Sequence, residues 1–381
     1  MSSRKKQIGY LIVGDSFVTF NSSNIIFPGG TERYIFLLAK YVQKFGLETT
    51  VIYPQFKGGR KSNGMIFNFR YKSFYSPKYM YNWFIDLFSF INTYKTIKKI
   101  KPDIVHIISV KYRFSLGAII AAKMCQKKIV YTRTTPPNMN TKSKLAVLLD
   151  DFVVVPLIRK KIDVTIALTS EMKLILESLE FNNVHYIPNF IELPKFVKSF
   201  SPQKNHRLLY VGRVEENKGI MILLQAIAKL ISQKINVCLF LIGPCKTPEY
   251  FENIITEYNL NKHVFLMGTL PYNNLLEYYQ KCDCFVFPSL LEGGHAMAIL
   301  EAMSYGLPII ASDIKPNQEL LENGKCGLLY SCQKPIELCN NIIHLLEDEK
   351  LIHYYSNLSY ERSKSYSATT IVSNLLEILD A

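Results

Sequence analysis

The sequence predicts an α/β protein with two doubly wound domains that face a central cleft. The prediction rests on the length of 381 residues, on short unbroken runs of Val, Ile and Leu, and on longer helical patterns that alternate with these runs. A chain of this length is too long for one compact core and suits two domains. Strands that are apolar throughout are typical of parallel sheets with helices on both faces.

The first half of the chain carries one series of strands and helices, which we assign to a domain of residues 1–190. Its clearest helical patterns span residues 31–45 and 114–125. The expected strands are Ile8–Val13, Thr49–Tyr53, Ile104–Ile108, Lys128–Thr132 and Val164–Leu168.

The pattern restarts near residue 207, so a second domain is expected at residues 191–365. The stretch 189–205 contains Pro194 and Pro202 and is the expected joint. Ligands of doubly wound sheets bind beyond the carboxyl ends of the strands, which places the expected site in the cleft. The expected strands are Arg207–Val211, Val237–Ile242, Val264–Met267, Cys284–Phe287 and Ile309–Ala311, with helices at 219–233, 250–258, 273–281 and 296–305.

Charge is distributed unevenly along the chain. Residues 1–190 hold 28 Lys and Arg against 11 Asp and Glu, a net charge of +17, and the remainder carries 17 against 20, a net charge of −3. A cationic first half indicates an anionic partner, which is a membrane surface, a phosphorylated lipid or a nucleic acid.

The cysteines and the apolar runs indicate a cytoplasmic protein. None of the eight cysteines forms a C-x-x-C pair, and most lie in apolar runs, so we expect reduced thiols of the core. The first apolar stretch is too short for a signal peptide, and no run approaches the ~20 apolar residues of a membrane span. Membrane contact is therefore expected to be peripheral.

The strongest motif is a glycine pair between a strand and a helix in the second half. Gly293 and Gly294 precede a helix that begins near Ala296. The free N–H groups of a helix's first turn and its partial positive charge can hold an anion or sugar hydroxyls. Glu292 can accept hydrogen bonds from a sugar, and Glu301 can bind two hydroxyls of a ribose. The alternative is a simple turn followed by a solvated helix charge.

A second motif follows the first strand of the second series. Gly212 leads into a tight loop that Arg213 and Lys218 bracket. Two cations in this position can neutralise a departing diphosphate, the Arg as a planar fork and the Lys as a point charge. Ordinary surface charge is the alternative.

A third motif opens the first helical pattern of the chain. Gly29 and Gly30 allow the backbone to approach a ligand closely, and Thr31 can cap the helix. A flexible connecting loop is the alternative.

Taken in order, these motifs resemble the family 4 retaining glycosyltransferases, the glycosyl transferases group 1, over nearly the whole chain. The resemblance implies the GT-B architecture of two Rossmann-like domains, no metal, no cofactor, and a UDP- or GDP-linked sugar bound mainly by the second domain. It also implies a C-terminal helix, residues 366–381, that crosses back to the first domain. The collinear residues are Gly29-Gly30, Lys101-Pro102-Asp103, Ile187-Pro188-Asn189, Gly212-Arg213, Lys218-Gly219, Gly243, Glu292, Glu301, Gly306, Pro308 and Glu319.

The resemblance implies a role for individual residues. Arg213, Lys218 and Glu292 are the expected catalytic residues, of which the two cations match the family's diphosphate-binding pair. Glu301 matches the ribose-binding Glu. The expected donor-binding residues are Gly29, Gly30, Gly212, Gly268, Leu270, Gly293, Gly294, His295, Ala296 and Glu301.

The sequence departs from the family in the loop between its paired glutamates. The family usually has seven residues between them, whereas eight separate Glu292 from Glu301 here. His295 in this longer loop is either a sugar contact or a structural residue.

The expected acceptor-binding residues, His106 and Arg133, mark a second departure. The family's usual functional His falls at Ile108, and His106 looks like the buried His that often precedes it. Arg133 stands where another common His occurs.

From these features we predict a hexosyltransferase at the inner face of the cell membrane that acts in polysaccharide or glycolipid synthesis. Residues 57–101 mix basic with aromatic side chains, which suits an anionic membrane surface and a lipid-linked or glycan acceptor. A catalytically weak nucleotide-sugar-binding relative, a basic nucleic-acid-binding protein and a GT-B epimerase are the alternatives.

Overall fold

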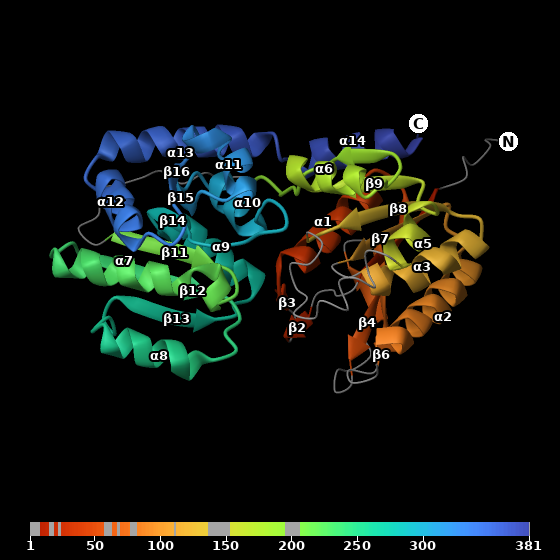
Figure 1. Cartoon of the computed structure of the whole chain (residues 1–381), viewed down its shortest axis with the longest axis horizontal. Coiled ribbons are helices and arrows are strands. Elements are labelled where there is room, and N and C mark those ends of the chain that lie inside the picture. The colour runs from red at the N-terminus through yellow and green to blue at the C-terminus, as the bar shows by residue number, and fades with distance from the viewer. Residues whose placement is uncertain are drawn as a thin grey trace. The chain divides into compact units, whose positions relative to one another are not determined.

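The computed structural model divides the chain into two compact units (Figure 1). The first unit comprises Met1–Phe17, Thr31–Pro188 and Ala368–Ala381, and the second comprises Val18–Gly30 and Asn189–Ser367. The structure describes residues 8–14, 19–21, 24–56, 63–66, 69–76, 82–109, 112–135, 153–194 and 206–380.

The first unit contains an eight-stranded sheet in the order β10-β9-β8-β7-β1-β4-β6-β5, in which every neighbouring pair is parallel except β5 and β6. Its strands are β1 (Gly9–Gly14), β4 (Glu48–Phe56), β5 (Asn63–Ile66), β6 (Phe69–Ser76), β7 (Ile104–Ser109), β8 (Lys128–Arg133), β9 (Val164–Ala167) and β10 (Val184–Tyr186). Its helices are α1 (Gly30–Lys44), α2 (Asn82–Ile100), α3 (Tyr112–Met124), α5 (Val155–Arg159), α6 (Ser170–Ser178) and α14 (Ala368–Asp380).

The second unit contains a six-stranded parallel sheet in the order β13-β12-β11-β14-β15-β16. Its strands are β11 (His206–Val211), β12 (Val237–Ile242), β13 (Val264–Gly268), β14 (Cys284–Phe287), β15 (Ile309–Ser312) and β16 (Leu328–Tyr330). Its helices are α7 (Ile220–Ser232), α8 (Pro248–Glu257), α9 (Tyr272–Lys281), α10 (Met297–Ser304), α11 (Lys315–Leu320), α12 (Pro335–Leu346) and α13 (Glu349–Lys364), with short 3₁₀ turns at Glu216–Lys218 and Glu322–Gly324. A hairpin of β2 (Thr19–Asn21) and β3 (Asn24–Ile26) also belongs to this unit.

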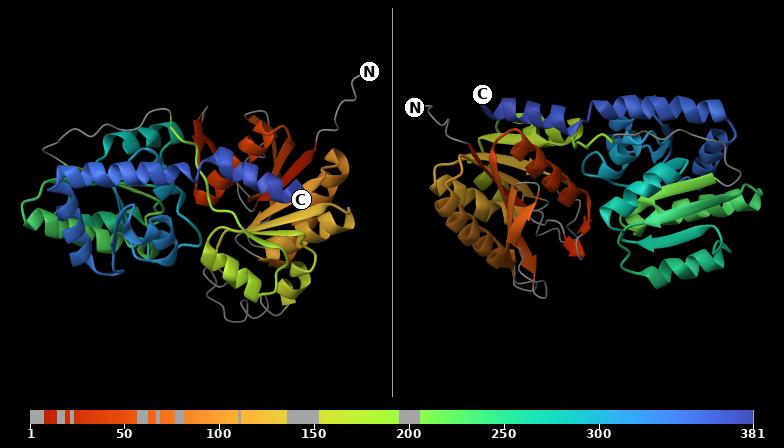
Figure 2. Two further views of the ribbon diagram at one scale, coloured as in Figure 1. Left: turned by 90° about the horizontal axis from the view of Figure 1, so that it is seen from above. Right: turned by 180° about the vertical axis from the view of Figure 1, so that it is seen from behind.

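The predicted fold class, α/β with two parallel-sheet Rossmann-like domains, is confirmed. Each predicted strand is present, and its ends lie within three residues of the predicted ones. Both faces of the second sheet carry helices, with α7 and α9 on opposite sides (Figure 2). The central strand β7 is buried over all six residues, as expected for a strand covered on both faces.

The order of the strands defines the place where a ligand of the second unit is expected. The chain builds β11, β12 and β13 in one direction, then returns to add β14, β15 and β16 on the other side of β11. The loops after β11 and β14 therefore leave the sheet in opposite directions, and the crevice between them is where doubly wound sheets bind their ligands.

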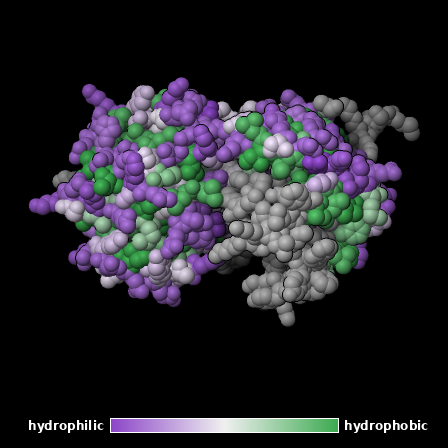
Figure 3. All heavy atoms as spheres, viewed as in Figure 1, coloured by the Kyte–Doolittle hydropathy of each residue, from purple (hydrophilic) through white to green (hydrophobic). Residues whose placement is uncertain are grey.

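Over the second unit, the coloured residues in Figure 3 show hydrophilic and apolar side chains interspersed, with no broad apolar patch among them. Within the described ranges, no helix has a stretch that is long and apolar enough to span a bilayer. Part of the basic and aromatic segment of residues 57–101, namely 57–62, 67–68 and 77–81, lies outside the described residues.

Candidate active site

The loops after β11 and β14 approach each other closely at one glycine. Gly219 has φ +69°, and a Cβ atom built on it would lie 2.0 Å from the carbonyl oxygen of Pro288. Only glycine avoids this overlap, because it has no Cβ and accepts a positive φ without strain. The loop carrying the two predicted cations is therefore held against the loop carrying Glu292.

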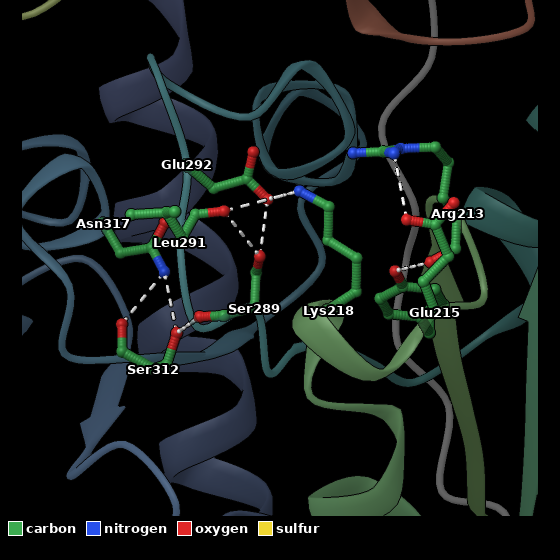
Figure 4. A network of polar contacts seen from close by, with 9 residues as sticks. Arg213, Glu215, Lys218, Ser289, Leu291, Glu292, Ser312 and Asn317 are labelled. Atoms are coloured by element: carbon green, nitrogen blue, oxygen red, sulfur yellow. Dashed lines mark hydrogen bonds and ion pairs between the residues drawn. The ribbon is translucent and has the colours of Figure 1, made fainter. Parts of the chain in front are cut away.

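Lys218 and Glu292 form an ion pair across these loops (Figure 4). The Lys218 side chain is 9% exposed and that of Glu292 is 15% exposed. Lys218 Nζ also lies 3.5 Å from the carbonyl oxygen of Leu291. An ammonium group is costly to remove from water, and the ion pair with the Glu292 carboxylate offsets part of this cost at the crevice.

A series of hydrogen bonds between buried polar residues holds the Glu292 carboxylate in place. Ser289 Oγ donates to Glu292 Oε1 at 2.7 Å, and Ser312 Oγ donates to the carbonyl oxygen of Ser289. Asn317 Nδ2 donates to the carbonyl oxygen of Ser312 at 2.9 Å. Ser289, Ser312 and Asn317 have no exposed surface, so their hydrogen bonds join the ends of β14 and β15 to α11. The sequence alone does not predict these three residues, because isolated Ser and Asn residues carry no motif until the neighbouring strands are known.

Arg213 lies on the same loop as Lys218 but in a different environment. Its side chain is 44% exposed, and Nη1 contacts Glu215 Oε2 at 2.9 Å. Tyr210 Oη donates to the carbonyl oxygen of Arg213 at 2.7 Å, which fixes the backbone at the end of β11. Burial raises the pKa of Tyr210 well above its usual value, so the phenol remains a donor. The guanidinium can therefore reach a ligand while its backbone stays in place.

Glu301 lies on α10 and is held by two tyrosines of α9. Tyr279 Oη donates to Oε2 at 3.1 Å and Tyr272 Oη donates to Oε1 at 3.3 Å. Glu301 is 7% exposed, so it is not the solvated helix charge considered as an alternative. The rings of Phe27 and Tyr272 make a T-shaped contact, with centroids 5.4 Å apart. Both carboxylate oxygens are thus oriented, and each retains lone pairs that can accept from a vicinal diol.

The glycine-loop residues lie at the N-terminus of α10. Gly293, Gly294 and His295 are buried, and Ala296 is the extended residue that precedes the helix. A Cβ on Gly30 would lie 3.4 Å from Met297 Cγ, so the backbone of Gly30 packs against the first residue of α10. The structure therefore brings the first-helix glycine motif and the α10 glycine motif together. Gly29 precedes Gly30 in a bend.

The remaining predicted donor residues lie at the carboxyl ends of other strands in the same sheet. Gly212 directly follows β11, and its N–H donates to the carbonyl oxygen of Ile242 at 2.9 Å. Gly268 ends β13, is exposed and has φ +63°, and Leu270 is half-buried. These residues line the same edge of the sheet as Arg213, at increasing distance from β14 in the strand order.

His106 and Arg133, the predicted acceptor residues, lie in the first unit. His106 has no exposed surface, and both ring nitrogens are hydrogen-bonded, Nδ1 to Tyr10 Oη at 2.6 Å and Nε2 to Thr132 Oγ1 at 2.7 Å. Burial lowers the pKa of His106 to about 3, so the ring is neutral. Arg133 ends β8, is 4% exposed and donates from Nε to the carbonyl oxygen of Thr135 at 2.7 Å. In this arrangement His106 joins three strands, and its contact with an acceptor stays a prediction.

Two Rossmann-like sheets, with cations and carboxylates at the switch point of the second, define the GT-B class of glycosyltransferases. Residues 193–362 match the family model described as glycosyl transferases group 1, and residues 28–195 match the model described as glycosyltransferase family 4. The chain belongs to this family.

Two curated relatives and one solved structure illustrate the similarity. The chain is 26% identical over 311 residues to the Escherichia coli UDP-Gal:α-D-GlcNAc-diphosphoundecaprenol α-1,3-galactosyltransferase, covering 77% of this chain and 79% of that protein. It is 28% identical over 177 residues to the Campylobacter jejuni N-acetylgalactosamine-N,N'-diacetylbacillosaminyl-diphospho-undecaprenol 4-α-N-acetylgalactosaminyltransferase, covering 46% of this chain and 47% of that one. The structure of Anabaena HepE in complex with UDP and glucose superposes with a TM-score of 0.77 at 18% identity over 98% of this chain and 100% of that chain, which shows a shared fold.

Proposed function

We propose that the chain is a retaining, metal-independent glycosyltransferase that moves a sugar from a nucleotide diphosphate donor to a lipid-linked or glycan acceptor. The observation that carries the proposal is the Lys218–Glu292 pair at the switch point of the second sheet, with Arg213 on the same loop. A buried lysine and an accessible arginine on one loop suit the two phosphates of such a donor.

The relatives support the chemical class of donor and acceptor. The E. coli relative is named for a UDP-galactose donor, and the HepE structure contains UDP. Both the E. coli and the C. jejuni relatives are named for acceptors built on diphosphoundecaprenol. We therefore propose a UDP- or GDP-linked sugar as donor and a polyprenyl-diphosphate-linked sugar as the first acceptor to test.

The proposed mechanism is electrostatic. As the bond between the anomeric carbon and the diphosphate breaks, negative charge develops on the leaving phosphate. Arg213 and Lys218 would stabilise this charge without rearrangement, because Gly219 and Tyr210 already hold the loop after β11 in place. For a retaining transfer, the acceptor hydroxyl attacks from the face that the diphosphate leaves and passes its proton to a phosphate oxygen of the donor.

The first unit is proposed to select the acceptor at the inner face of the cell membrane. Residues 1–190 have a net charge of +17, and the C-terminal half of α2 contributes Lys95, Lys98 and Lys99. Each basic residue near an anionic surface contributes about 1 kcal/mol of binding free energy. Co-sedimentation with anionic but not neutral vesicles, weakened by salt, is expected. Equal sedimentation with both vesicle types, or with neither, would contradict membrane binding.

The experiment that tests the function is a donor screen followed by product analysis. Titration calorimetry against UDP-, GDP- and ADP-linked hexoses should find one nucleotide class that binds, and addition of a polyprenyl-diphosphate-linked sugar should yield a product with the donor's anomeric configuration by NMR. Activity should persist in excess EDTA. Donor binding without transfer or hydrolysis would identify the catalytically weak relative instead. Isomerised donor without acceptor would identify an epimerase, and binding of nucleic acid alone would reject the proposal.

A further inference from the structure

His295 lies in the loop that is one residue longer than the family's usual spacing, and the structure shows where its side chain goes. The ring is 1% exposed. Nε2 lies 3.3 Å from Glu319 Oε1, and the imidazole makes a T-shaped contact with the ring of Tyr366, with centroids 5.6 Å apart and planes at 87°. The side chain therefore points into the protein, toward α11 and the end of α13.

The backbone of His295 makes a second attachment to a different segment. Its carbonyl oxygen accepts a hydrogen bond from Asn189 Nδ2 at 2.6 Å. Asn189 is the first residue of the second unit after the chain leaves the first unit at Pro188. One residue of the glycine loop is thus attached on one side to residue 189 and on the other to residue 366.

These two segments are themselves joined. The N–H of Ile191 donates to the carbonyl oxygen of Tyr366 at 2.9 Å, and Ile191 pairs with Ser367 in a parallel bridge. Ser367 is the last residue of the second unit before the chain returns to the first unit at Ala368. Both passages of the chain between its units at 188–189 and 367–368 therefore lie next to residues that contact His295.

Tyr366 is a rigid support for the imidazole. Arg362 stacks on its ring at 5.1 Å, and Arg362 Nη2 donates to Tyr366 Oη at 2.9 Å. Arg362 Nη1 also pairs with Glu322 Oε1 at 2.9 Å. Burial raises the pKa of Tyr366 to about 12, so the phenol stays neutral. A planar ring fixed at both its face and its hydroxyl leaves the imidazole few alternative positions.

We propose that His295 is a positioning residue that fixes the glycine loop, residues 293–296, against Glu319 and the two segments at which the chain passes between its units. The inference rests on the proposed function for its consequence, because this loop would hold the transferred sugar. Loss of the attachment should weaken binding of the sugar part of the donor. Binding of the nucleotide part should stay unchanged, because the proposed ribose-binding residue Glu301 is held separately, by Tyr272 and Tyr279 of α9.

The test compares His295→Phe, which keeps a ring against Tyr366 but removes both nitrogens, with His353→Phe. His353 is a matched control, since it also faces a glutamate, Glu349, at 3.8 Å but is 50% exposed and lies on α13. We expect His295→Phe to raise the KM for the nucleotide sugar about tenfold, the effect of one lost buried charge-assisted contact. The Kd of the free nucleoside diphosphate should change less than about twofold, within the scatter of a surface substitution.

Two outcomes of these measurements would overturn the positioning role of His295. A parallel rise in the KM of the nucleotide sugar and the Kd of the free nucleotide would show general damage to the unit and overturn it, as would an unchanged KM. Where His295→Phe does not fold, Glu319→Gln removes the partner's charge at constant shape and should give the same split.

A measurement without substrate separates this inference from the proposed function. Hydrogen exchange of the amides of residues 293–296 should be slow in the unmodified chain and at least tenfold faster in His295→Phe or Glu319→Gln. Unchanged exchange would overturn the positioning role even if the chain transfers sugar. Faster exchange in a chain that transfers no sugar would support the positioning role and reject the function.

Discussion

The ammonium of Lys218 lies against the carboxylate of Glu292, so that two residues 74 positions apart form an ion pair between the loops that follow β11 and β14. Glu292 was expected to contact the sugar and Lys218 the diphosphate. Their pairing means that each orients the other, and a change to either should alter both functions.

Removal of a cation from the loop after β11 is the most direct test of the proposed chemistry. Lys218→Met and Arg213→Ala should each lower kcat by roughly 10²-fold or more, because each removes a positive charge that would stabilise the leaving diphosphate in the transition state. Steady-state transfer assays measure this effect. Lys246→Ala, on an 84% exposed side chain near Glu215, is the control and should retain its kcat. An Arg213→Ala enzyme with unaltered turnover would remove Arg213 from the mechanism.

Substitution of Tyr279 tests the ribose site. Tyr279→Phe deletes the hydroxyl that donates to Glu301 at 3.1 Å and leaves the buried carboxylate with one tyrosine donor fewer. A lost hydrogen bond to a charged group costs about 1.5–3 kcal/mol, so the Kd of the nucleotide should rise by about tenfold or more. Tyr278→Phe, one position along the same helix, should leave the Kd unchanged in the same calorimetric titration.

The tight approach at Gly219 predicts a large loss of stability on a small substitution. Gly219→Ala places a Cβ atom 2.0 Å from the Pro288 carbonyl oxygen, and the resulting shift of backbone should cost about 3 kcal/mol or more. Gly268→Ala has a similar φ, +63°, but open space around the added atom, and should cost about 1 kcal/mol. Urea unfolding of both variants measures the difference. Equal losses would show that the backbone angle alone matters.

The buried His106 predicts a pH dependence of stability. Its pKa is lowered from 6.5 to about 3 by burial, so the unfolded chain binds a proton that the folded chain does not. Stability from this group is fully present above about pH 6.5 and is lost as the pH falls toward 3, at up to about 1.4 kcal/mol per pH unit. The free energy of unfolding should therefore fall by about 2 kcal/mol between about pH 7 and pH 5.

The control for this prediction is the exposed His353. His106→Gln should remove the histidine's part of the pH dependence, whereas His353→Gln should keep it, since His353 is 50% exposed. A His106→Gln chain with the same slope as the unmodified chain would assign the effect to other groups.

Much of the fold could be predicted from the sequence because parallel strands covered on both faces must be apolar over their whole length. Runs such as Ile104–Ile108 and Cys284–Phe287 have no other stable place than a sheet interior. The hairpin of Thr19–Asn21 and Asn24–Ile26 was missed, because two strands of three residues carry too little pattern. The strand Leu328–Tyr330 was missed for the same reason.

The candidate site was only partly predictable. Arg213 and Lys218 could be proposed because each is a charged residue next to a glycine in the loop after a predicted strand, and Glu301 because it lies in the helix that follows the glycine pair. Ser289, Ser312 and Asn317 could not, since their roles depend on which strands are neighbours. The same holds for the contact of His295 with Glu319 and Tyr366.

The two alternating α/β series, the charge of the first half and the positions of the glycine motifs can all be read from the amino-acid sequence, because they follow from residue type and spacing along the chain. Three features of the site required the folded structure: the pairing of Lys218 with Glu292, the burial of Glu301 beside two tyrosines, and the inward direction of the His295 side chain. Those outcomes depend on side chains that meet across strand ends, and the free energy of such contacts is set by burial and partner geometry, which no local pattern records.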